Sequence, residues 1–488
     1  MSDPARRARA TAGILVGLLL AALDGTVVAT ALPRILDELS GFDLYFLPAT
    51  VFMLCQTVSM PLWGRFSDLY GRGPLHLLAV GILVAASVLC GLSRTMGALV
   101  AWRSVQGLGA GGLMALSFTM IADLYEQEER ARMQGAISSV WGVAALFGPL
   151  VGGWVTRVWS WQGVFYLNVP VGIVSAALVQ ASWERRARGT VGRPDLAGAF
   201  LLALASAALL AGFGIAGREA RLSGSAMGAF GAAAVLAAAL VAVERRRPDP
   251  FLAYDLYRNR LFAAGAATGV CAMTALFAAV MHVPLLVAGV LGKSLETGGY
   301  MLTCMMGPWI VCSALTRVLL ARFSYRTLAV TGMALAAASY ALLAGGAPSI
   351  GLGRVIAAML VLGTGLGLTV APLLIAVQNA APRERLGAAT SLTQFTRSMG
   401  AALGLAVMGG LLTSAFGGRE PEGIIKFRAH MDPEMLRAAV APLAEGLAKV
   451  FRCALAISCF GAVLACAIPG EKARDLRAGA RLSAPSSG

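Results

Sequence analysis

The sequence predicts an all-α integral membrane protein that crosses the bilayer about fourteen times. Of its 488 residues, 58% are hydrophobic and only 13% are charged, and the mean hydropathy is +0.74. A soluble domain carries about 25% charged residues. The hydrophobic residues also fall in blocks of about 20, the length that a helix needs to cross roughly 30 Å of hydrocarbon. Together, these observations exclude a soluble fold.

Charged residues, Gly and Pro separate the hydrophobic blocks and so define the expected spans. They are placed near residues 12–33, 44–64, 75–93, 98–121, 133–155, 163–182, 196–216, 225–243, 261–288, 298–319, 327–347, 353–380, 388–415 and 449–468. An even number of spans puts both termini on one side of the membrane. Lys and Arg are more numerous in the loops on that side, so we expect a multi-pass protein of the cytoplasmic membrane with both termini in the cytoplasm.

Three parts are expected along the chain. They are an N-terminal six-helix bundle (1–182), two additional membrane helices with cytoplasmic linkers (183–260), and a C-terminal six-helix bundle (261–488) that includes an outer loop (416–448) and a cytoplasmic tail. A faint repeat supports two halves, because residues 68–72 and 321–326 each follow the second helix of a half. The outer loop has an amphipathic pattern, which predicts a helix on the membrane surface or a lid over the exit.

The charge and the cysteines exclude other classes of protein. The formal net charge is +15, but the basic residues are spread over short loops, so topology explains them and no nucleic-acid partner is expected. All eight cysteines lie within hydrophobic blocks, without a C-x-x-C pair. They are expected to be buried thiols, with neither a disulfide nor a metal site.

Asp24 lies near the middle of the first span. A carboxylate at that depth costs about 2.5–3.5 kcal/mol on insertion scales, so it should face the bundle interior, paired or partly protonated. Desolvation favours the neutral form of a carboxyl group and a nearby cation favours the charged form, which allows its charge to switch as access alternates. The alternative is a structural hydrogen bond.

Arg103 lies in the fourth span and also needs partners inside the membrane. Asp24 is the candidate partner. The alternative is that Arg103 extends to the membrane surface from a span that begins later than expected.

Residues 64–72 predict a tight cytoplasmic loop after the second span. Its glycines, Gly64 and Gly71, permit a sharp turn and close packing, while Asp68 and Arg72 can form a charge latch between helices that separate during a change of state. A solvated loop would also be charged, but the Gly-x-x-x-Asp-x-x-Gly-Arg spacing is more specific than that.

In the fifth span, Gly148, Pro149, Gly152 and Gly153 predict close helix contact and a bend. Gly and Pro are common in membrane helices generally, so this motif alone is weak evidence.

Five further residues are candidates for a substrate cavity: Gln106, His282, Met305, Trp309 and Gln394. His282 could relay protons or contact substrate, but a single histidine near a helix end is more often structural. Met305 and Trp309 belong to a soft surface that suits varied hydrophobic ligands, and lipid-facing packing explains them almost as well.

In this order, the motifs resemble the major facilitator superfamily, specifically its fourteen-helix drug:proton antiporter branch. Residues 24–33, 64–72, 103–112 and 148–153 are similar to the branch's first-helix, loop, fourth-helix and antiporter motifs, and 159–172 and 394–400 also resemble branch patterns. The resemblance covers essentially the whole chain. It implies the major facilitator fold, with two six-helix halves and two extra central helices.

The resemblance also implies roles for individual residues. Asp24 would take and release the coupling proton under the influence of Arg103, Asp68 and Arg72 would govern the cytoplasmic gate, and Gly148 with Pro149 would shape the helix that prevents leak. The chain departs from the branch in two places. Residues 285–288 are Leu-Leu-Val-Ala, where relatives often show Leu-Tyr-Leu-Gln. The tenth span contains no acidic residue.

The expected function is proton-coupled export of small lipophilic compounds, such as drugs or toxic metabolites, with about one proton per cycle. Protons are the coupling ion and no other cofactor is expected. The partners are the substrate and the lipid bilayer, and a monomer is compatible with these motifs. Two alternatives are a dedicated exporter of one natural product or siderophore and a non-transporting sensor or scaffold. An enzyme is not expected, because no metal cluster, nucleophile triad or nucleotide loop occurs in the sequence.

Overall fold

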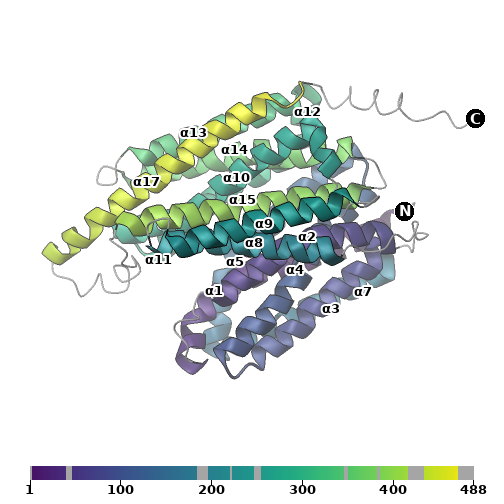
Figure 1. The fold of residues 1–488 in the computed structure, drawn as a ribbon, viewed down its shortest axis with the longest axis horizontal. Coiled ribbons are helices and arrows are strands. Elements are labelled where there is room, and N and C mark those ends of the chain that lie inside the picture. The colour runs from purple at the N-terminus through teal and green to yellow at the C-terminus, as the bar shows by residue number, and fades with distance from the viewer. Residues whose placement is uncertain are drawn as a thin grey trace, which may run out of the picture. The chain divides into compact units, whose positions relative to one another are not determined.

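Helices make up all the regular secondary structure in the residues that the structure describes. The computed structural model describes residues 3–39, 47–183, 196–219, 223–246, 254–345, 350–381, 385–415 and 433–470. Figure 1 shows the helices in chain order from purple to yellow. The predicted all-α fold class is confirmed.

The contacts within the chain divide it into two compact units. Unit 1 comprises Met1–Ala203, Ala238–Tyr254 and Ala381–Phe395, and unit 2 comprises Leu204–Ala237, Asp255–Ala380 and Thr396–Gly488. The boundaries therefore fall within α8 (Leu196–Glu219), α9 (Gly224–Arg245) and α15 (Leu386–Ala415), and after the first residue of the 3-10 helix η2 (Tyr254–Arg258). The three-part division expected from the sequence stays a prediction.

The remaining helices of unit 1 come from the first part of the chain. They are α1 (Pro4–Leu39), α2 (Leu47–Tyr70), α3 (Arg72–Gly91), α4 (Met96–Leu124), α5 (Gln127–Val158), α6 (Trp161–Tyr166) and α7 (Asn168–Ser182). Helix α4 packs along both α2 and α3, while α1 packs along α4, α5 and α7. This arrangement brings one face of α1, α3, α4 and α7 together.

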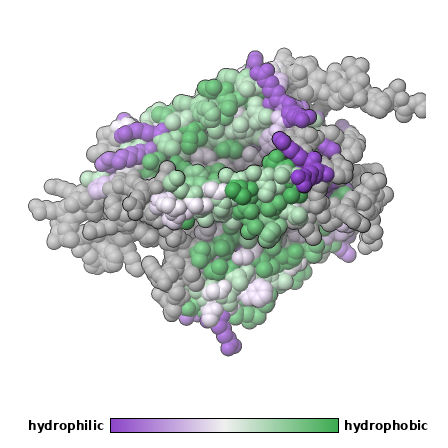
Figure 2. Space-filling model, viewed as in Figure 1, coloured by the Kyte–Doolittle hydropathy of each residue, from purple (hydrophilic) through white to green (hydrophobic). Residues whose placement is uncertain are grey.

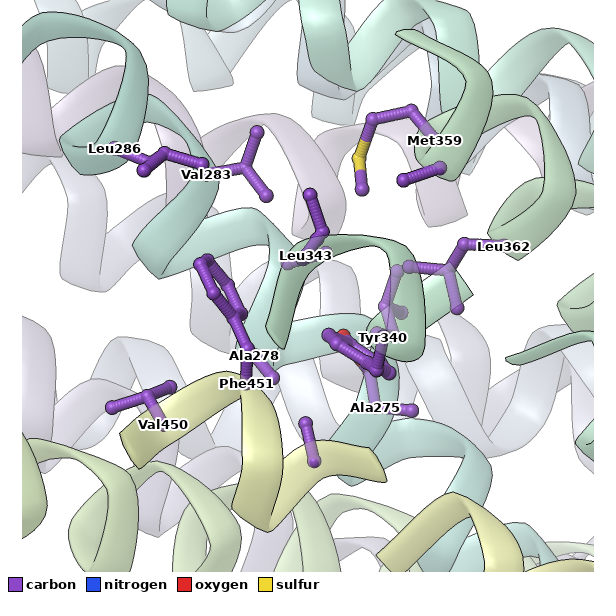
Figure 3. Packing of buried hydrophobic residues seen from close by; sticks show 14 of the residues in the cluster. Ala275, Ala278, Val283, Leu286, Tyr340, Leu343, Met359, Leu362, Val450 and Phe451 are labelled. Atoms are coloured by element: carbon purple, nitrogen blue, oxygen red, sulfur yellow. The ribbon is translucent and has the colours of Figure 1, made fainter. Parts of the chain in front are cut away.

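The remaining helices of unit 2 follow the extra helix pair. They are η2 (Tyr254–Arg258), α10 (Arg260–Leu285), the π-helix η3 (Leu286–Val290), α11 (Leu295–Ala314), α12 (Thr316–Arg322), α13 (Tyr325–Ala344), α14 (Leu352–Ala380) and α17 (Pro433–Cys466). Their core is hydrophobic, and Figure 3 shows side chains of α10, α13, α14 and α17 converging in it. Tyr340 is fully buried there, stacks on Phe451 and donates a hydrogen bond to the Ala275 carbonyl.

The number of membrane spans agrees with the prediction of about fourteen. Among the described residues, ten helices are long and hydrophobic enough to cross a membrane, or eleven if α11 and α12 form one bent span. Helices α2, α5 and α8 lie at three further expected spans, but their described residues are not long and hydrophobic enough to count among these candidates. Figure 2 shows that hydrophobic side chains cover much of the visible surface. Exposed Phe200, Met227, Val235 and Phe460 are examples of side chains suited to contact lipid.

Two predicted spans are interrupted. In the span expected at 163–182 the helix is interrupted at Leu167, between α6 and α7, although Trp161–Ser182 is still one candidate membrane span. Pro170, which has no N–H to bond the carbonyl four residues before it, lies in the first turn of α7. The span expected at 298–319 bends by 56° between α11 and α12. There the Thr316 hydroxyl donates to the Cys312 carbonyl at 3.3 Å, a side-chain bond of the kind that bends helices.

Two helices extend beyond their predicted ends. Helix α2 continues to Tyr70 instead of ending near residue 64, so most of the expected loop is helical. Helix α17 begins at Pro433, inside the segment expected as an outer loop, and runs to Cys466 without a break. Residues 416–432 of that segment lie outside the described residues.

Candidate functional site

Asp24 lies inside unit 1 with its side chain almost completely buried. The residue is 2% exposed, and its carboxylate accepts hydrogen bonds from three side chains. Oδ2 accepts from Arg103 Nη1, which also makes this contact an ion pair. Oδ1 accepts from Gln106 Nε2 at 2.8 Å and from Asn168 Nδ2 at 2.7 Å. The structure therefore brings Asp24 and its candidate partner Arg103 into direct contact.

Arg103 is held by contacts on several sides and is only 1% exposed. Its Nη1 also donates to Gln106 Oε1 at 2.7 Å, and its Nε donates to the Pro48 carbonyl at 3.3 Å. The guanidinium carbon lies 4.0 Å from the centre of the Phe52 ring, a cation–π contact. This burial is incompatible with the alternative in which Arg103 extends to the membrane surface.

Gln106 joins the charged pair to a second layer of polar groups. Its amide nitrogen donates to Asp24 and to Ser87 Oγ at 2.5 Å, while its oxygen accepts from Arg103 and from Cys90 Sγ at 3.6 Å. Asn168 likewise donates to Ser87 Oγ at 2.9 Å. We call the set Asp24, Ser87, Arg103, Gln106 and Asn168 the Asp24 network. Its members come from α1, α3, α4 and α7, and all of them are buried.

The Asp24 network can respond to a single proton. Hydrogen bonds between charged groups are stronger than those between neutral groups, and a low local dielectric strengthens them further. Protonation of Asp24 removes the negative charge that Arg103 faces, so the guanidinium must then rely on Gln106 and backbone carbonyls. The arrangement can therefore couple proton binding on α1 to the packing of α3, α4 and α7.

The sequence missed two members of this network as site residues. Asn168 lies at the start of α7, directly after the break at Leu167, and Ser87 lies inside a hydrophobic span. Asn168 is part of the 159–172 pattern, which resembles the branch but implied no role for any single residue. Ser87 gave no signal, because a serine in a membrane helix usually bonds its own backbone.

The residues of the loop motif form a second cluster, at the end of α2. Asp68 Oδ1 lies 2.8 Å from Arg72 Nη2, and Arg72 Nε lies 2.8 Å from Asp123 Oδ2. Arg72 therefore bridges α2 to the end of α4. Asp123 was not a predicted site residue, and nothing in its position at the end of a span distinguishes it from a solvated acid.

Asp68 also contacts the first turn of α15. Its carboxylate accepts from the backbone N–H groups of Gly387 at 3.3 Å and Ala388 at 3.0 Å, which places a negative charge at a helix N-terminus. Asp68 lies beyond the predicted span 44–64, and burial raises the pKa of its carboxyl to about 6, against the opposing effect of Arg72. At pH 7 the carboxylate is therefore mostly charged, as these contacts require.

Two glycines shape this second cluster. Gly71 is the single residue between α2 and α3, and its φ of 90° is a conformation that other residues rarely adopt. Gly64 packs so closely on Ser391 and Gly387 of α15 that a Cβ would overlap them. The predicted loop is thus a one-residue turn, with Gly64 and Asp68 on α2 and Arg72 at the start of α3.

The antiporter motif lies within α5, which is continuous from Gln127 to Val158. Gly148 and Gly152 are buried, in accord with close packing, whereas Gly153 is exposed and has no neighbouring atom within 4 Å of a Cβ position. Pro149 is in the helix, and its side chain lies outside the described residues. The expected bend at this motif stays a prediction.

The five residues expected in a substrate cavity lie in different environments. Gln106 belongs to the Asp24 network, and Gln394 is half-buried on α15. His282 is 5% exposed, with Nδ1 3.0 Å from the Ala278 carbonyl of its own helix, and Met305 is buried in the core of unit 2 with Trp309 packed against that core. A common cavity for these residues stays a prediction.

Comparison with known proteins gives one family over most of the chain. The model of the Major Facilitator Superfamily matches residues 14–405. Multidrug transporter protein MdtP of Bacillus subtilis is 30% identical over 408 residues, which cover 83% of this chain and 75% of that protein. An uncharacterized MFS-type transporter of Mycobacterium tuberculosis is 32% identical over 480 residues, which cover 95% of this chain and 69% of that protein.

A second Bacillus subtilis relative and one solved structure complete the comparison. Multidrug resistance protein 3 is 30% identical over 405 residues, which cover 83% of this chain and 79% of that protein. The crystal structure of the human organic anion transporter TETRAN has a TM-score of 0.66 and 16% identity, covering 95% of this chain and 100% of that one. At that identity the likeness shows the fold alone.

Proposed function

Because the chain belongs to the major facilitator superfamily of membrane transporters, we propose that it exports small lipophilic compounds in exchange for protons, by alternating access. Its location would be the cytoplasmic membrane, with both termini in the cytoplasm, as the distribution of Lys and Arg favours. Relatives whose names describe multidrug transport support the class of substrate. The Asp24 network supports the coupling.

The observation that carries this proposal is the buried ion pair between Asp24 and Arg103. Each charge is nearly inaccessible, and removing one partner of such a pair typically costs about 3–5 kcal/mol. A proton that neutralises Asp24 has the same effect on Arg103 as removal of its partner, so the network relaxes to another arrangement. Release of the proton on the other side of the membrane restores the pair and completes the cycle.

The cluster around Asp68 gives the second part of the mechanism. Its contacts join the ends of α2 and α4 to the first turn of α15, all within unit 1. A cytoplasmic entrance can open only if helices separate at that end, so these contacts would hold it closed. The proton site and the gate are then distinct sets of residues that share helix α2. This helix carries both Phe52, which contacts Arg103, and Asp68.

Sensitivity of an efflux-deficient host to a panel of unrelated lipophilic compounds tests the function. Expression of the parental chain should raise tolerance to several of them, and Asp24→Asn at equal expression should not. Glu445→Gln is the matched control, because Glu445 is an exposed acid on α17 and its loss should leave tolerance unchanged. Tolerance to one compound only would favour the dedicated exporter, and no difference between parental and Asp24→Asn chains would reject the proposal.

A further inference from the structure

His76 is a buried histidine that belongs to neither of the two clusters described above. It lies on α3, one turn after Arg72, and is 0% exposed. It was not a predicted site residue, because it stands at the very start of the expected span 75–93. Ionisable side chains inside a membrane protein are costly and often mark the route of an ion or a proton, so the surroundings of this ring bear on the coupling.

The contacts of Ser175 fix the tautomer of the His76 ring. The Ser175 hydroxyl, on α7, donates its single hydrogen to the Gly13 carbonyl of α1 at 2.8 Å. His76 Nε2 lies 3.2 Å from the same hydroxyl oxygen, so Nε2 must carry a hydrogen and donate it. The neutral ring then has its lone pair on Nδ1, which is buried without a hydrogen-bond partner among the described residues. This nitrogen is therefore a base that can accept a proton.

The His76 ring lies on the same helix faces as the Asp24 network. It packs against α1, where a Cβ on Gly17 would lie 2.9 Å from His76 Cε1. Gly17 precedes Asp24 by seven residues on α1, and Ser175 follows Asn168 by seven residues on α7. Seven residues make about two helical turns and rise about 10.5 Å. The ring is therefore two turns from the carboxylate, toward the N-terminal end of α1.

A thin hydrophobic layer separates His76 from the Asp24 network. Leu20 of α1 and Val80 and Val84 of α3 surround Gly172 of α7 so closely that a Cβ on this glycine would touch or overlap them. Gly172 lies one turn from each of the two polar sites along α7. Within α1, α3, α4 and α7, no ionisable residue stands between His76 and the network. On these helices, His76 is thus the first ionisable group that a proton leaving the network would meet toward this end.

The charges around His76 allow the ring to become positive. Toward the same end, the helices packed around it carry Arg6, Arg7 and Arg9 on α1, Arg65 and Asp68 on α2, Arg72 on α3 and Asp123 on α4, while α6 and α7 carry no charged residue. Arg72 precedes His76 by four residues and so shares its face of α3. The Arg72 charge is balanced by Asp68 and Asp123, each at 2.8 Å, so it does not exclude a second cation one turn away.

We propose that His76 relays the coupling proton between Asp24 and the cytoplasm. When water enters the hydrophobic layer, it carries the proton from the Asp24 carboxyl group to Nδ1 of His76. The imidazolium keeps its hydrogen bond from Nε2 to Ser175 and releases the proton from Nδ1 to water once the cluster around Asp68 opens. The inference rests on the proposed function, which supplies the proton and places this end of α1 in the cytoplasm.

Two rates measured in the same proteoliposomes test the relay. His76→Gln keeps an amide that can donate to Ser175 but cannot carry a proton, so substrate-driven proton movement should fall about tenfold or more. Counterflow, the exchange of labelled for unlabelled substrate, needs the same binding and helix movements without release of a proton. Its rate should stay within about twofold of the parental value. A purely structural role for His76 would lower both rates together.

Ser93→Ala is the matched control for these rates. Ser93 follows α3 at its other end, is buried, and donates from its hydroxyl to the Leu89 carbonyl of the same segment. Its loss removes a buried polar group without touching the route from Asp24 to His76. Both rates should therefore remain at the parental value.

The tautomer can be measured without transport. The chain has three histidines, so His282→Gln with His430→Gln leaves His76 as the single one. Nitrogen NMR of its ring should show a hydrogen on Nε2 and a bare Nδ1. A hydrogen on Nδ1 instead would remove the accepting base and overturn the relay. This measurement also serves if His76→Gln does not fold.

The outcomes separate the relay from the proposed function. Proton movement at the parental rate in His76→Gln would overturn the relay and leave the proposed function intact. An equal fall in proton movement and counterflow would also overturn it, because His76 would then be a packing residue. A parental chain that performs counterflow without moving protons would reject the proton coupling itself, and the relay with it.

Discussion

Asp24 combines a high cost of burial with an unusually complete set of partners. A charged carboxylate in the middle of a span costs about 2.5–3.5 kcal/mol, and Arg103, Gln106 and Asn168 together offset that cost. Every one of these donors loses part of its interaction when the carboxylate is neutralised. Under the proposed coupling, a single proton on Asp24 would therefore change the contacts that α1 makes with α4 and α7.

Asn168→Ala tests whether this set of partners matters for transport. The substitution removes the hydrogen bonds to Asp24 and to Ser87 without removing a charge. Hydrogen bonds to charged groups are worth about 1.5–3 kcal/mol, so the initial rate of substrate-driven proton movement should fall roughly tenfold to a hundredfold. The measurement is the pH change inside proteoliposomes that contain a known amount of folded protein.

Thr331→Ala is the control for that experiment. The Thr331 hydroxyl is exposed on α13 and bonds carbonyls of its own helix, at Thr327 and Leu328. Its loss should leave the rate within about twofold of the parental value, as is usual for a surface substitution. If Asn168→Ala also left the rate at the parental value, the amide would not take part in coupling.

The sequence reveals the charged members of the site better than the neutral ones. Asp24 and Arg103 stand out because charged residues are rare in hydrophobic blocks, and solvation cost alone predicts that they need partners. Ser87, Gln106 and Asn168 are neutral, and such residues occur in many spans. Only the packing of α3, α4 and α7 shows that Gln106 and Asn168 meet at one carboxylate and that both also donate to Ser87.

Among the elements, the turn between α2 and α3 is the most tightly specified. Gly71 alone connects the two helices, at φ 90° and ψ 150°. The turn sets the spacing between Asp68, three residues before it, and Arg72, directly after it. The cluster at this end of α2 therefore depends on a backbone conformation that only glycine adopts readily.

Gly71→Ala should destabilise the protein by about 1–3 kcal/mol, the usual cost of a side chain in such a backbone conformation. The expected result is a lower midpoint of thermal unfolding in detergent, together with weaker proton-driven transport. Gly97→Ala is the matched control, since Gly97 is an exposed residue of α4 with no atom near a Cβ position. Equal midpoints for the two variants would show that the turn tolerates a side chain.

Hydrophobic block length predicts where helices lie but not where they break. The all-α class and most spans follow from hydropathy, because a backbone in lipid must satisfy its hydrogen bonds internally. The interruption at Leu167 lies near Pro170, which lacks a backbone N–H, and the bend at Leu315 lies where the Thr316 hydroxyl bonds the Cys312 carbonyl. The length of a hydrophobic block reveals neither feature.

At the scale of the whole molecule, the net charge moved per cycle sets the substrate gradient that the membrane potential can support. One proton moving inward against a neutral substrate gains about 2.3 kcal/mol per 100 mV, enough for a roughly 50-fold substrate gradient. Exchange of one proton for a monocation is electroneutral and gains nothing from the potential. We therefore expect an imposed potential of about 100 mV to raise the accumulation of a neutral substrate about 50-fold and that of a monocation not at all.

Proteoliposomes with a potassium diffusion potential allow both substrates to be compared in one preparation. The steady-state accumulation of each is measured at zero and at full potential, with no pH difference. A neutral substrate that accumulates to about the square of the expected gradient would indicate two protons per cycle. Such a result would remove the claim that a single carboxylate carries the coupling.

The most direct test of the central claim is substrate-driven proton movement in proteoliposomes containing the parental chain or Asp24→Asn. Addition of a transported compound should move protons across the membrane with the parental chain. The Asp24→Asn substitution should abolish this movement, while Glu445→Gln leaves it unchanged. If Asp24→Asn exchanged protons for substrate at the parental rate, Asp24 would not be the coupling carboxylate.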